Sequence, residues 1–355
     1  MVEKKLACVI AAGGTAGHVD PALAVGEALR HRGVSVSFAG SPDRAEARLV
    51  PEAGFELDPF TVLGFPRRPG PTLVRAVGRA AVAPAACVQI LDRRGPDVVL
   101  GGGGFVAGPM VLAARLKSLP AALMEADAHL GLANRLAAPF ARRVFLAYPL
   151  EGRRGPKYRV TGRPVRHTAD VEPGEARRKF GLPEEKPLLL VFGGSLGSEA
   201  LNELAVESFA RSGPAVLHLC GARYEADLRP RVSRPDYVLL PWTDDIGRAL
   251  AAADVVLARA GGSLWEIAAA GKPAVLVPSP NVTADHQTKN ARYFERGGGA
   301  VVVPEVDIAR AAGVVRSLLG DERRRAEMGE AMLRLARPDA AEEIAEELIG
   351  LAGAG

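Results

Sequence analysis

Two stretches of the sequence share one order of residue types, and this order decides the fold. The first reads VIAAGGTAG at residues 9–17, and the second reads LLVFGGSLG at residues 189–197. In each stretch an apolar run leads into two glycines, a hydroxyl residue, one further residue and a third glycine. A buried strand that ends in a glycine turn and continues into a helix is typical of Rossmann-like sheets. The approximate repeat therefore predicts two similar domains that face each other across a cleft.

Short apolar runs alternate with longer helical stretches along the rest of the chain. The runs are continuously apolar, which indicates parallel sheets covered by helices on both faces. We therefore expect an α/β fold with doubly wound parallel sheets. The predicted strands are Leu6–Ala12, Val34–Ala39, Asp97–Leu100, Ala121–Met124, Val144–Ala147, Leu188–Phe192, Ala215–Cys220, Tyr237–Leu240, Asp254–Ala258, Ala274–Val277 and Ala300–Val303. The predicted helices include Pro21–Arg32, Glu199–Arg211, Leu264–Ala270 and His286–Arg296.

The length of the chain and one polar stretch set the domain division. At about 150 residues per domain, a chain of 355 residues corresponds to two domains. Residues 162–174 contain Pro164 and Pro173 among several charges and are typical of a linker. We place the boundary between residues 163 and 164, with a first domain over 1–163 and a second over 164–337.

Composition excludes several classes of protein. Hydrophobic residues make up 48% and charged residues 24%, which is ordinary for a globular protein and argues against disorder. The net charge is only +4, aromatic residues make up 5%, and no helix carries a dense basic stripe. We therefore expect no nucleic-acid partner.

Cysteine spacing and apolar run length argue against a zinc site and against a membrane span. The three cysteines are widely spaced without a Cys-x-x-Cys pair, which is typical of a reducing compartment. No cluster of His, Asp and Glu demands a metal, so we expect neither a metal nor a cofactor. No apolar run reaches about 18 residues. The run Leu6–Ala12 is too short for a signal peptide and better fits a buried strand.

Three glycine-rich turns are candidate anion sites: Gly13–Gly17, Gly101–Gly104 and Gly193–Gly197. Glycine lets backbone N–H groups approach a phosphate, and the start of a following helix favours negative charge. None of the three has the Gly-x-Gly-x-x-Gly spacing of dinucleotide sites or the Gly-Lys-Ser/Thr of a P-loop. A plain strand–helix connection is the alternative for any single turn.

Titratable residues follow two of the predicted strands in the first half. His18 closes the first glycine turn, where an imidazole can act as a general base near neutral pH. Glu125 and Asp127 follow the strand Ala121–Met124 and are placed to share acid–base work. A structural, hydrogen-bonded role for His18 and a solvated loop around Glu125 are the alternatives.

Polar residues also follow two predicted strands in the second half. Arg259 and the glycines before Ser263 form a fourth strand–glycine–helix unit, which can neutralise a leaving diphosphate without a metal. Glu266, one turn into that helix, can accept from two adjacent hydroxyls of a ribose or interact with the helix dipole. Asp285 and Gln287 offer groups suited to sugar hydroxyls, with a helix cap at Asp285 as the alternative.

In this order the motifs resemble those of the MurG family of bacterial N-acetylglucosaminyltransferases. The resemblance covers essentially the whole chain. The matching strings are GGTAGH at 13–18, PDVV at 96–99, GGFVAGP at 103–109, GGSLG at 193–197, RAG at 259–261, EIA at 266–268 and ADHQT at 284–288.

The resemblance implies a GT-B fold and an inverting glycosyl transfer. The donor is UDP-N-acetylglucosamine, and the acceptor is the C4 hydroxyl of N-acetylmuramyl-pentapeptide pyrophosphoryl-undecaprenol, a polyprenyl diphosphate called lipid I. The product is lipid II of peptidoglycan synthesis, which serves cell wall biogenesis, cell shape and cell division. The helix over residues 338–355 is implied to pack back on the first domain.

The resemblance also implies the site residues. Arg166 and Ser195 contact the nucleotide or its diphosphate, Glu266 the ribose, and Asp285 and Gln287 the donor sugar. His18 is the expected base and Asp127 its rival, with Glu125 beside them. Further donor-binding residues are Thr243, Ile246, Arg259, Gly261, Gly262 and Ser263. The acceptor-binding residues are Gly14, Thr15, Ala16, Gly17, His18, Gly103, Gly104 and Asn134.

Members of this family are peripheral proteins on the cytoplasmic face of the cell membrane. Phe65, Arg67 and Arg68, together with the stretch Leu73–Leu91, supply apolar groups beside cations. This composition suits a surface of anionic lipids. A buried helix packed on the sheet is the alternative for the longer stretch.

Several positions depart from the usual sequence of the family. Residues 125–127 read Glu-Ala-Asp where Glu-Gln-Asn is common, Phe105 replaces a common Tyr, and Arg163 replaces a common Asn. The stretch of residues 259–266 is one residue shorter than the corresponding stretch of the family's usual sequence. These changes leave open a related GT-B transferase that acts on another lipid or a small-molecule acceptor. A UDP-N-acetylglucosamine 2-epimerase, which shares the two-domain architecture, is a further alternative. A non-catalytic protein that binds a nucleotide sugar or a dinucleotide is another.

Overall fold

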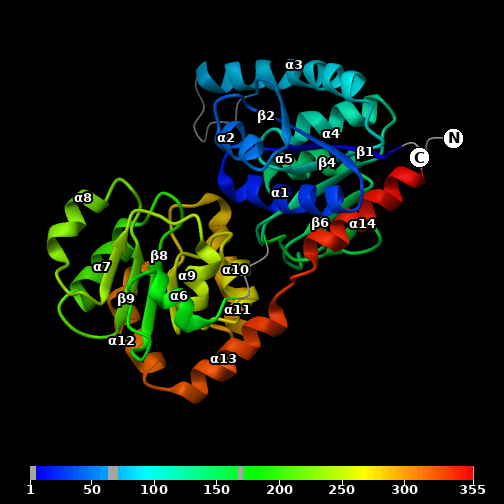
Figure 1. Ribbon diagram of the computed structural model, residues 1–355. Helices are drawn as coiled ribbons and strands as arrows, with labels where there is room; N and C mark the ends of the chain where they lie inside the picture. Colours follow the sequence, from blue (N-terminus) through cyan, green and yellow to red (C-terminus); the bar gives the residue numbers. More distant parts are fainter. Residues whose placement is uncertain (1–4, 63–70, 167–170, 355) are drawn as a thin grey trace. The chain divides into compact units, whose positions relative to one another are not determined.

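The structure divides into two compact units, each built on one parallel sheet (Figure 1). The computed structural model describes residues 5–62, 71–166 and 171–354. Unit 1 consists of Met1–Arg166 and Arg337–Gly355, and unit 2 consists of His167–Ala336. The boundary predicted between residues 163 and 164 lies close to the first of these divisions. Residues 167–170 of the predicted linker lie outside the described part of the chain.

The described part of unit 1 holds a seven-stranded sheet with the order β3-β2-β1-β4-β5-β6-β7. Its strand pairs are all parallel. The five strands predicted in this half are present, which confirms the doubly wound α/β class. The strands are β1 (Ala7–Ala12), β2 (Ser35–Gly40), β3 (Glu56–Pro59), β4 (Val98–Gly103), β5 (Ala121–Glu125), β6 (Arg143–Leu146) and β7 (Tyr158–Val160).

Strands β3 and β7 are not predicted from the sequence, and both are edge strands. β3 reads ELDP and β7 reads YRV, so neither forms a continuous apolar run. An edge strand has a neighbour on one side only, and polar residues are tolerated there. Arg159 and Val160 of β7 are indeed exposed. A search for continuous apolar runs finds buried central strands and passes over these two.

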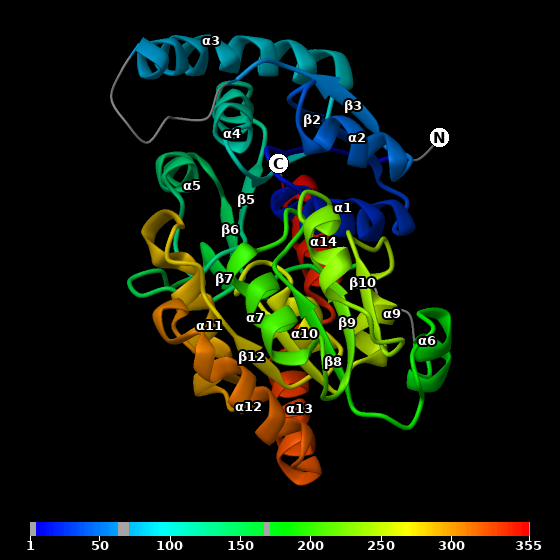
Figure 2. The ribbon, with the colours of Figure 1, turned by 90° about the vertical axis from the view of Figure 1, so that its left-hand side faces the viewer.

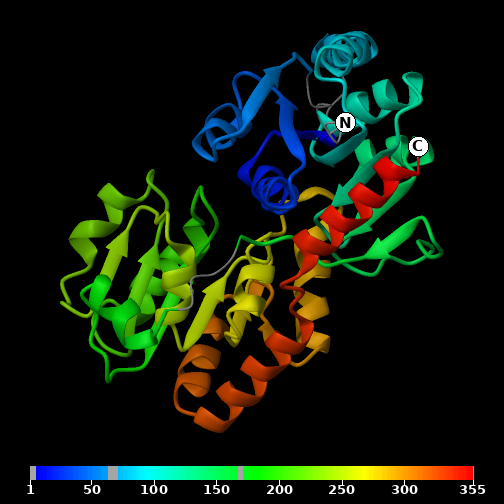
Figure 3. The ribbon, with the colours of Figure 1, turned by 45° about the vertical axis from the view of Figure 1, so that its right-hand side comes forward.

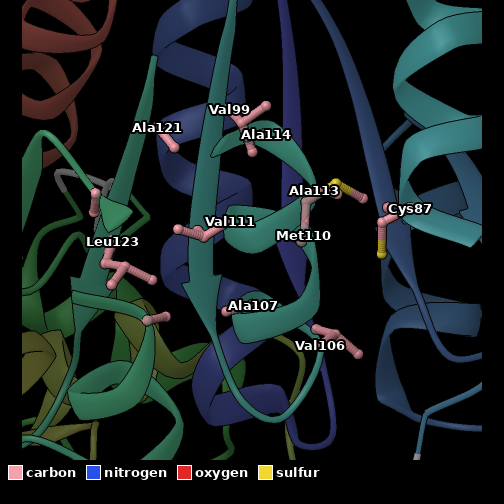
Figure 4. Packing of buried hydrophobic residues seen from close by; sticks show 14 of the residues in the cluster. Cys87, Val99, Val106, Ala107, Met110, Val111, Ala113, Ala114, Ala121 and Leu123 are labelled. Carbon is pink, nitrogen blue, oxygen red and sulfur yellow. The ribbon is translucent and has the colours of Figure 1, made fainter. Parts of the chain in front are cut away.

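Helices cover both faces of the first sheet. One face carries α1 (Ala16–His31), α2 (Ala45–Glu52) and α14 (Ala340–Gly353). The other face carries α3 (Pro71–Arg94), α4 (Ala107–Leu116), α5 (Leu132–Ala137) and the 3₁₀ helix η1 (Ala138–Phe140). On this second face Met110 and Val111 of α4 belong to one core cluster with Cys87 of α3 and Val99 of β4 (Figure 4).

Helix α1 begins at Ala16, whereas the sequence analysis predicts its start at Pro21. The glycine turn after β1 passes directly into the helix, so that Pro21 lies inside it. Proline has a helical φ but cannot donate a hydrogen bond to the carbonyl four residues earlier. That carbonyl belongs to Gly17, and it accepts a hydrogen bond from Arg163 at 2.8 Å.

The C-terminal helix α14 belongs to unit 1, where it packs beside α1 (Figure 3). Ile344, Leu348 and Leu351 recur at helical spacing and join the core cluster that contains Phe145. Glu347 on the same helix pairs with Arg143 of β6 at 3.1 Å. The chain therefore leaves unit 1 at Arg166 and returns to it at Arg337, after building unit 2.

Unit 2, as described from residue 171 onward, holds a six-stranded parallel sheet with the order β10-β9-β8-β11-β12-β13. The strands are β8 (Leu188–Phe192), β9 (Ala215–Leu219), β10 (Tyr237–Leu240), β11 (Val255–Ala258), β12 (Ala274–Leu276) and β13 (Ala300–Val302). All six are predicted from the sequence.

Helices and short 3₁₀ segments connect these strands. They are α6 (Pro173–Lys179), α7 (Glu199–Phe209), α8 (Glu225–Leu228), η2 (Arg229–Arg231), α9 (Ile246–Ala252), α10 (Leu264–Ala269), η3 (Thr283–Asp285), α11 (His286–Arg296), η4 (Glu305–Asp307), α12 (Ala309–Leu319) and α13 (Glu322–Leu335). Helices α12 and α13 lie side by side (Figure 2). Helices α7 and α12 contribute to the same core cluster.

Both sheets reverse their strand order at one point. The reversal lies between β1 and β4 in unit 1 and between β8 and β11 in unit 2. Ligands of doubly wound sheets bind at such a point, outside the carboxyl ends of the strands. Each of these four strands ends in one of the glycine turns found in the sequence. The topology therefore places the candidate site residues where such folds bind ligands.

A buried polar chain lies next to the first glycine turn of unit 2. His218 of β9 is fully buried, with Nδ1 2.9 Å from the Tyr237 hydroxyl and Nε2 3.0 Å from Asn202 Oδ1. Because Asn202 Oδ1 only accepts, Nε2 carries the proton and the Tyr237 hydroxyl donates to Nδ1. Asn202 Nδ2 donates to the Cys220 carbonyl at 2.9 Å. Burial lowers the pKa of His218 to about 3, because a charged imidazole would lose its hydration there.

We expect unit 2 to lose stability in mild acid through His218. The unfolded chain binds a proton below about pH 6.5, whereas the folded chain excludes it down to about pH 3. The stability is therefore complete above pH 6.5 and falls with pH, by about 2 kcal/mol between pH 6.5 and about pH 5. Urea unfolding at the two pH values measures the loss.

The variant His218→Leu should unfold more easily at neutral pH but with a smaller dependence on pH. The matched control is His31→Gln, which changes an exposed histidine of α1 and should keep the full dependence. An unchanged pH dependence in His218→Leu would contradict the assignment.

Candidate active site

The first glycine turn of unit 1 is held by a buried carboxylate. Glu46 of α2 is fully buried, and its two oxygens accept from the Gly14 and Ser41 N–H groups, both at 2.9 Å. Gly14 has a φ of 97°, which favours glycine. Glu46 is not among the site residues predicted from the sequence. Its signal is the spacing to Val50, four residues later, which places it on the buried face of α2.

The second glycine turn of unit 1 lies directly against the first. The Gly13 N–H donates to the Gly103 carbonyl at 3.3 Å. Gly104 has a φ of 76°, and a Cβ atom at this position would lie 2.0 Å from the Gly13 carbonyl oxygen. Only glycine allows this approach, so the two turns form one continuous backbone surface.

His18 lies on that surface, in the first turn of α1. A Cβ atom at Gly103 would lie 2.8 Å from His18 Cδ2, so the imidazole packs on the second glycine turn. The Thr15 hydroxyl lies 3.3 Å from His18 Nδ1 and makes no capping bond to the helix backbone. The structure thus brings His18 together with the predicted acceptor residues Gly14, Thr15, Ala16, Gly17, Gly103 and Gly104.

Glu125 organises the loop after β5. It is buried, and one oxygen accepts from the Asp127 N–H at 3.3 Å. The other accepts from the Gly131 N–H at 2.8 Å and from Asn134 Nδ2 at 3.0 Å. Burial raises the pKa of this carboxyl, and the Gly131 and Asn134 donors oppose the shift. The contacts give Glu125 a positioning role and leave Asp127, which is half-buried, as the carboxylate of this loop nearer to solvent.

The side-chain oxygen of Asn134 is a hydrogen-bond acceptor to which no group of the described residues donates. Its Nδ2 donates to the Met124 carbonyl and to Glu125, both at 3.0 Å, and this fixes the orientation of the amide. Its Oδ1 is buried and has no hydrogen-bond partner within the described ranges. A buried acceptor without a partner costs free energy unless a ligand or water donates to it. This favours the predicted contact between Asn134 and the acceptor substrate.

In unit 2, Arg259 joins the ends of three strands. Its Nε donates to Ser198 Oγ at 2.9 Å, and its Nη1 donates to the carbonyls of Val277 and Pro278 at 3.1 and 3.3 Å. Its Nη2 forms an ion pair with Glu305 of η4. Because most of its donors bind protein acceptors, Arg259 shapes the surrounding loops.

A cavity of about 510 Å³ lies around these loops, at the carboxyl ends of the unit 2 strands. Two predicted donor-site residues, Arg259 and Gln287, line it. Arg223, which the sequence analysis missed, adds an exposed cation that stacks over the Tyr224 ring at 4.5 Å from its centroid. The sequence feature that could have identified Arg223 as a site residue is its position just after β9. The lining consists of Gly193, Gly197, Ser198, Glu199, Ala200, Arg223, Arg259, Ser279, Asn281, Gln287 and Glu305.

The other predicted nucleotide residues of unit 2 lie at the ends of three strands. Ser195 is exposed in the turn after β8. Thr243 accepts from the Asp245 N–H at 3.1 Å, and Asp245 in turn caps α9, which begins at Ile246. The turn of Gly261, Gly262 and Ser263 precedes α10, whose first turn carries the half-buried Glu266.

The segment before α11 has a strained backbone. Ala284 and Asp285 have φ values of 55° and 51°, a left-handed conformation that costs non-glycine residues about 1 kcal/mol or more each. Lys289 Nζ donates to the Ala284 carbonyl at 2.8 Å, and the Thr288 hydroxyl donates to the Asp285 carboxylate at 2.7 Å. Asp285 stands at the helix N-cap, yet its side chain accepts from this hydroxyl and from no helix N–H. Strain of this kind often marks a binding site.

Gln287 and Asp285 face different hollows of the same loop. Gln287 Oε1 accepts from the Ser279 N–H at 2.9 Å, which turns its amide nitrogen toward the other side. Asp285 lines a hollow of about 430 Å³ that also contains Pro280 and Arg292.

Arg166 lies in unit 1, although the sequence analysis assigned it to the second domain and to the nucleotide. Its Nη2 pairs with Glu27 of α1 at 3.1 Å.

No group of three or more His, Cys, Asp or Glu side chains in the described residues could hold a metal ion. Within the same residues, none of the helices has the length and apolar character that crossing a membrane requires.

Comparisons with known proteins match nearly the whole chain to one family. The glycosyltransferase family 28 N-terminal domain matches residues 8–146, and the C-terminal domain of the same family matches residues 188–344. A relative from Salinibacter ruber is 42% identical and covers 96% of this chain and 95% of its own. A relative from Halothermothrix orenii is 36% identical and covers 93% of this chain and 95% of its own. Both are named UDP-N-acetylglucosamine–N-acetylmuramyl-(pentapeptide) pyrophosphoryl-undecaprenol N-acetylglucosamine transferase.

Solved structures give the same answer for the fold. Acinetobacter baumannii MurG aligns with a TM-score of 0.77 at 27% identity, covering 98% of this chain and 99% of that one. A UDP-N-acetylglucosamine 2-epimerase aligns with a TM-score of 0.65 at 15% identity, covering 99% and 98%, which shows a shared fold alone.

Two doubly wound units with glycine turns at both strand reversals, together with these matches, define a glycosyltransferase of the GT-B class. The chain belongs to glycosyltransferase family 28 and, within it, to the MurG family of N-acetylglucosaminyltransferases.

We expect the first glycine turn to depend on both oxygens of Glu46. In Glu46→Gln an amide NH₂ replaces one oxygen and meets the N–H of Gly14 or Ser41, leaving a buried donor unsatisfied. The free energy of unfolding should fall by about 1–3 kcal/mol. The control is Glu52→Gln on the same helix, whose exposed ion pair with Arg48 should contribute less than about 1 kcal/mol. Equal losses in the two variants would contradict the role of Glu46.

Proposed function

We propose that this chain transfers N-acetylglucosamine from UDP-N-acetylglucosamine to the C4 hydroxyl of lipid I and forms lipid II for peptidoglycan synthesis. One observation carries the proposal: relatives named for this reaction match nearly the whole chain at 36–42% identity. In this proposal unit 2 binds the nucleotide sugar and unit 1 binds the acceptor.

The cavity of unit 2 suits a nucleotide sugar in size and chemistry. Its volume of about 510 Å³ lies within the range of small-molecule sites. The amide nitrogen of Gln287 can donate to a sugar hydroxyl, because its Oε1 is taken by Ser279. Asp285, which faces the neighbouring hollow, and Glu266, in the first turn of α10, lie outside the lining of this cavity. We assign Asp285 to another sugar hydroxyl and Glu266 to the two ribose hydroxyls, as the resemblance implies.

The leaving diphosphate needs positive charge and N–H donors. Arg223 is the exposed guanidinium of this cavity, whereas Arg259 is engaged by protein acceptors. The turn of Gly261–Ser263 adds backbone N–H groups at the start of α10. We infer that these groups, rather than Arg259, contact the diphosphate as it departs.

The acceptor diphosphate suits the glycine surface of unit 1. The N–H groups of Gly13 and Gly14 already donate inside the protein. The N–H groups of Thr15, Ala16 and Gly17 are at the start of α1, where helix geometry provides no internal acceptor. A diphosphate on these groups places the muramyl sugar near His18.

His18 acts as the general base in this proposal. It takes the proton of the acceptor C4 hydroxyl while that oxygen attacks the anomeric carbon, whose bond to the UDP oxygen breaks with inversion. The electron pair and the negative charge leave with UDP. The Thr15 hydroxyl orients the imidazole. Asp127 is the second candidate for the base, and Glu125 positions its loop.

Transfer of labelled sugar tests the function and the base together. Purified protein with radiolabelled UDP-N-acetylglucosamine and a short-chain lipid I analogue should yield labelled lipid. We expect His18→Ala to lower kcat by about 100-fold or more and Asp127→Asn to have a much smaller effect. Near-normal kcat in His18→Ala, with a large loss in Asp127→Asn, would make Asp127 the base.

Absence of any transfer by the wild-type protein would overturn the proposed acceptor. Tight binding of UDP in that case would indicate a transferase with another acceptor. Conversion of the donor sugar without acceptor, followed by proton NMR, would indicate an epimerase.

We also propose that unit 1 binds the cytoplasmic face of the membrane through anionic lipids. Phe65, Arg67 and Arg68, named in the sequence analysis for this role, lie outside the described residues, as do the side chains of residues 71–81. Support comes from a different surface. Leu132, Leu136 and Phe140 follow one another at helical spacing on α5 and η1 and are 49%, 60% and 42% exposed.

Two exposed cations lie in the same surface segment. Arg135 precedes Leu136, and Arg142 follows Phe140. Apolar side chains beside cations bind an interface through the burial of apolar area together with attraction to anionic lipids. We name Leu132, Leu136, Phe140, Arg135 and Arg142 the α5 patch.

The α5 patch should be required for liposome binding. The double variant Leu136→Ser/Phe140→Ser should reduce sedimentation with liposomes that contain phosphatidylglycerol by about tenfold or more, because it removes two large apolar groups. Transfer to a water-soluble acceptor analogue should persist. The control is Leu333→Ser, at an exposed leucine of unit 2. Unchanged sedimentation of the double variant would contradict the proposal.

A further inference from the structure

Pro21 removes one backbone hydrogen bond from α1, the helix that carries His18. Inside an α-helix each N–H donates to the carbonyl four residues earlier, and proline has no N–H. The carbonyl affected by Pro21 is that of Gly17, which directly precedes His18 in the first turn of α1. This turn therefore lacks one of the hydrogen bonds that would normally define its geometry.

Arg163 supplies the missing donor from a distant part of the chain. Its Nη2 donates to the Gly17 carbonyl at 2.8 Å, a distance typical of a strong hydrogen bond from a charged group. Arg163 follows strand β7, at the opposite end of the sheet order from β3, and is only 8% exposed. A buried guanidinium that binds a carbonyl is held rigidly, so the contact fixes the helix start.

The charges around Arg163 are consistent with this role. Asp20, also in the first turns of α1, lies near Arg163, Arg166 and Arg48, which oppose the rise in its pKa caused by burial. Arg166 is paired with Glu27 further along α1. Arg163 thus meets this helix through its hydrogen bond to the Gly17 carbonyl and through its attraction to Asp20, whereas Arg48 contributes charge from the surface.

We propose that Arg163 is a positioning residue for the transfer reaction: it replaces the helix hydrogen bond that Pro21 removes, and it thereby holds Thr15 and His18 in their working geometry. The proposal rests on the proposed function, in which His18 is the base.

Arg163→Ala should lower kcat by about tenfold or more and leave the KM for UDP-N-acetylglucosamine within about twofold, since misplacing a base affects the chemical step. Arg163→Gln, which keeps an N–H donor, should fall between Arg163→Ala and the wild type. Arg48→Ala removes a nearby surface charge without touching Gly17 and should keep kcat near the wild-type value.

A double-mutant cycle with Pro21→Ala gives the decisive test. Alanine at 21 restores a backbone N–H that can donate to the Gly17 carbonyl. Pro21→Ala/Arg163→Ala should therefore recover kcat to within about threefold of Pro21→Ala alone. An equal loss from Arg163→Ala in both backgrounds, or no loss in the wild-type background, would overturn the proposal.

Hydrogen exchange separates this proposal from the proposed function. The amides of residues 18–20 should exchange at least tenfold faster in Arg163→Ala and return toward the wild-type rate in the double variant. This readout needs no substrate. Accelerated exchange with rescue, in a protein that shows no sugar transfer, would support the contact and contradict the function. Unchanged exchange in an active enzyme would contradict the contact alone.

Discussion

Close contact between backbones is the constraint on which the glycine turns of each unit depend. At Gly104 a side chain would meet the Gly13 carbonyl at 2.0 Å, and at Gly197 it would meet the Cys220 carbonyl at the same distance. In each unit a glycine turn after a central strand lies against the turn of a neighbouring strand. This removes side chains from the carboxyl ends of the strands and leaves backbone N–H groups to face a ligand.

Buried charged and polar groups hold these turns from behind, and this explains why glycine alone does not define the site. Glu46 fixes the Gly14 turn, the chain of Tyr237, His218 and Asn202 supports the Cys220 carbonyl, and Arg259 joins the loops of unit 2. A flexible glycine turn would lose conformational entropy on binding a phosphate. The buried groups meet that cost during folding, so that the turns are preorganised.

The sequence predicted the central strands, the two-unit organisation and the glycine turns, because each leaves a local pattern. Continuous apolar runs marked the eleven strands that were expected, whereas the polar edge strands β3 and β7 left no such pattern. Glu46 and Arg223 were missed because their roles come from contacts across the fold. Local spacing also placed the start of α1 at Pro21, since the compensating donor, Arg163, is far away in the sequence.

The structure divides the arginines of unit 2 into two kinds, a distinction that their position in sequence motifs does not make. Arg259 follows a central strand and belongs to a family motif, yet its donors bind Ser198, Val277 and other protein acceptors. To contact a diphosphate it would have to release those partners, which costs the hydrogen bonds that shape the cavity. Arg223 lines the same cavity from an exposed position, and the hydrogen bond and the ring contact that it makes are both with the adjacent Tyr224, so its movement toward a diphosphate would leave the loops that Arg259 joins in place. Arg259 therefore holds the loops of the cavity in place, whereas Arg223 is the arginine available to contact the substrate.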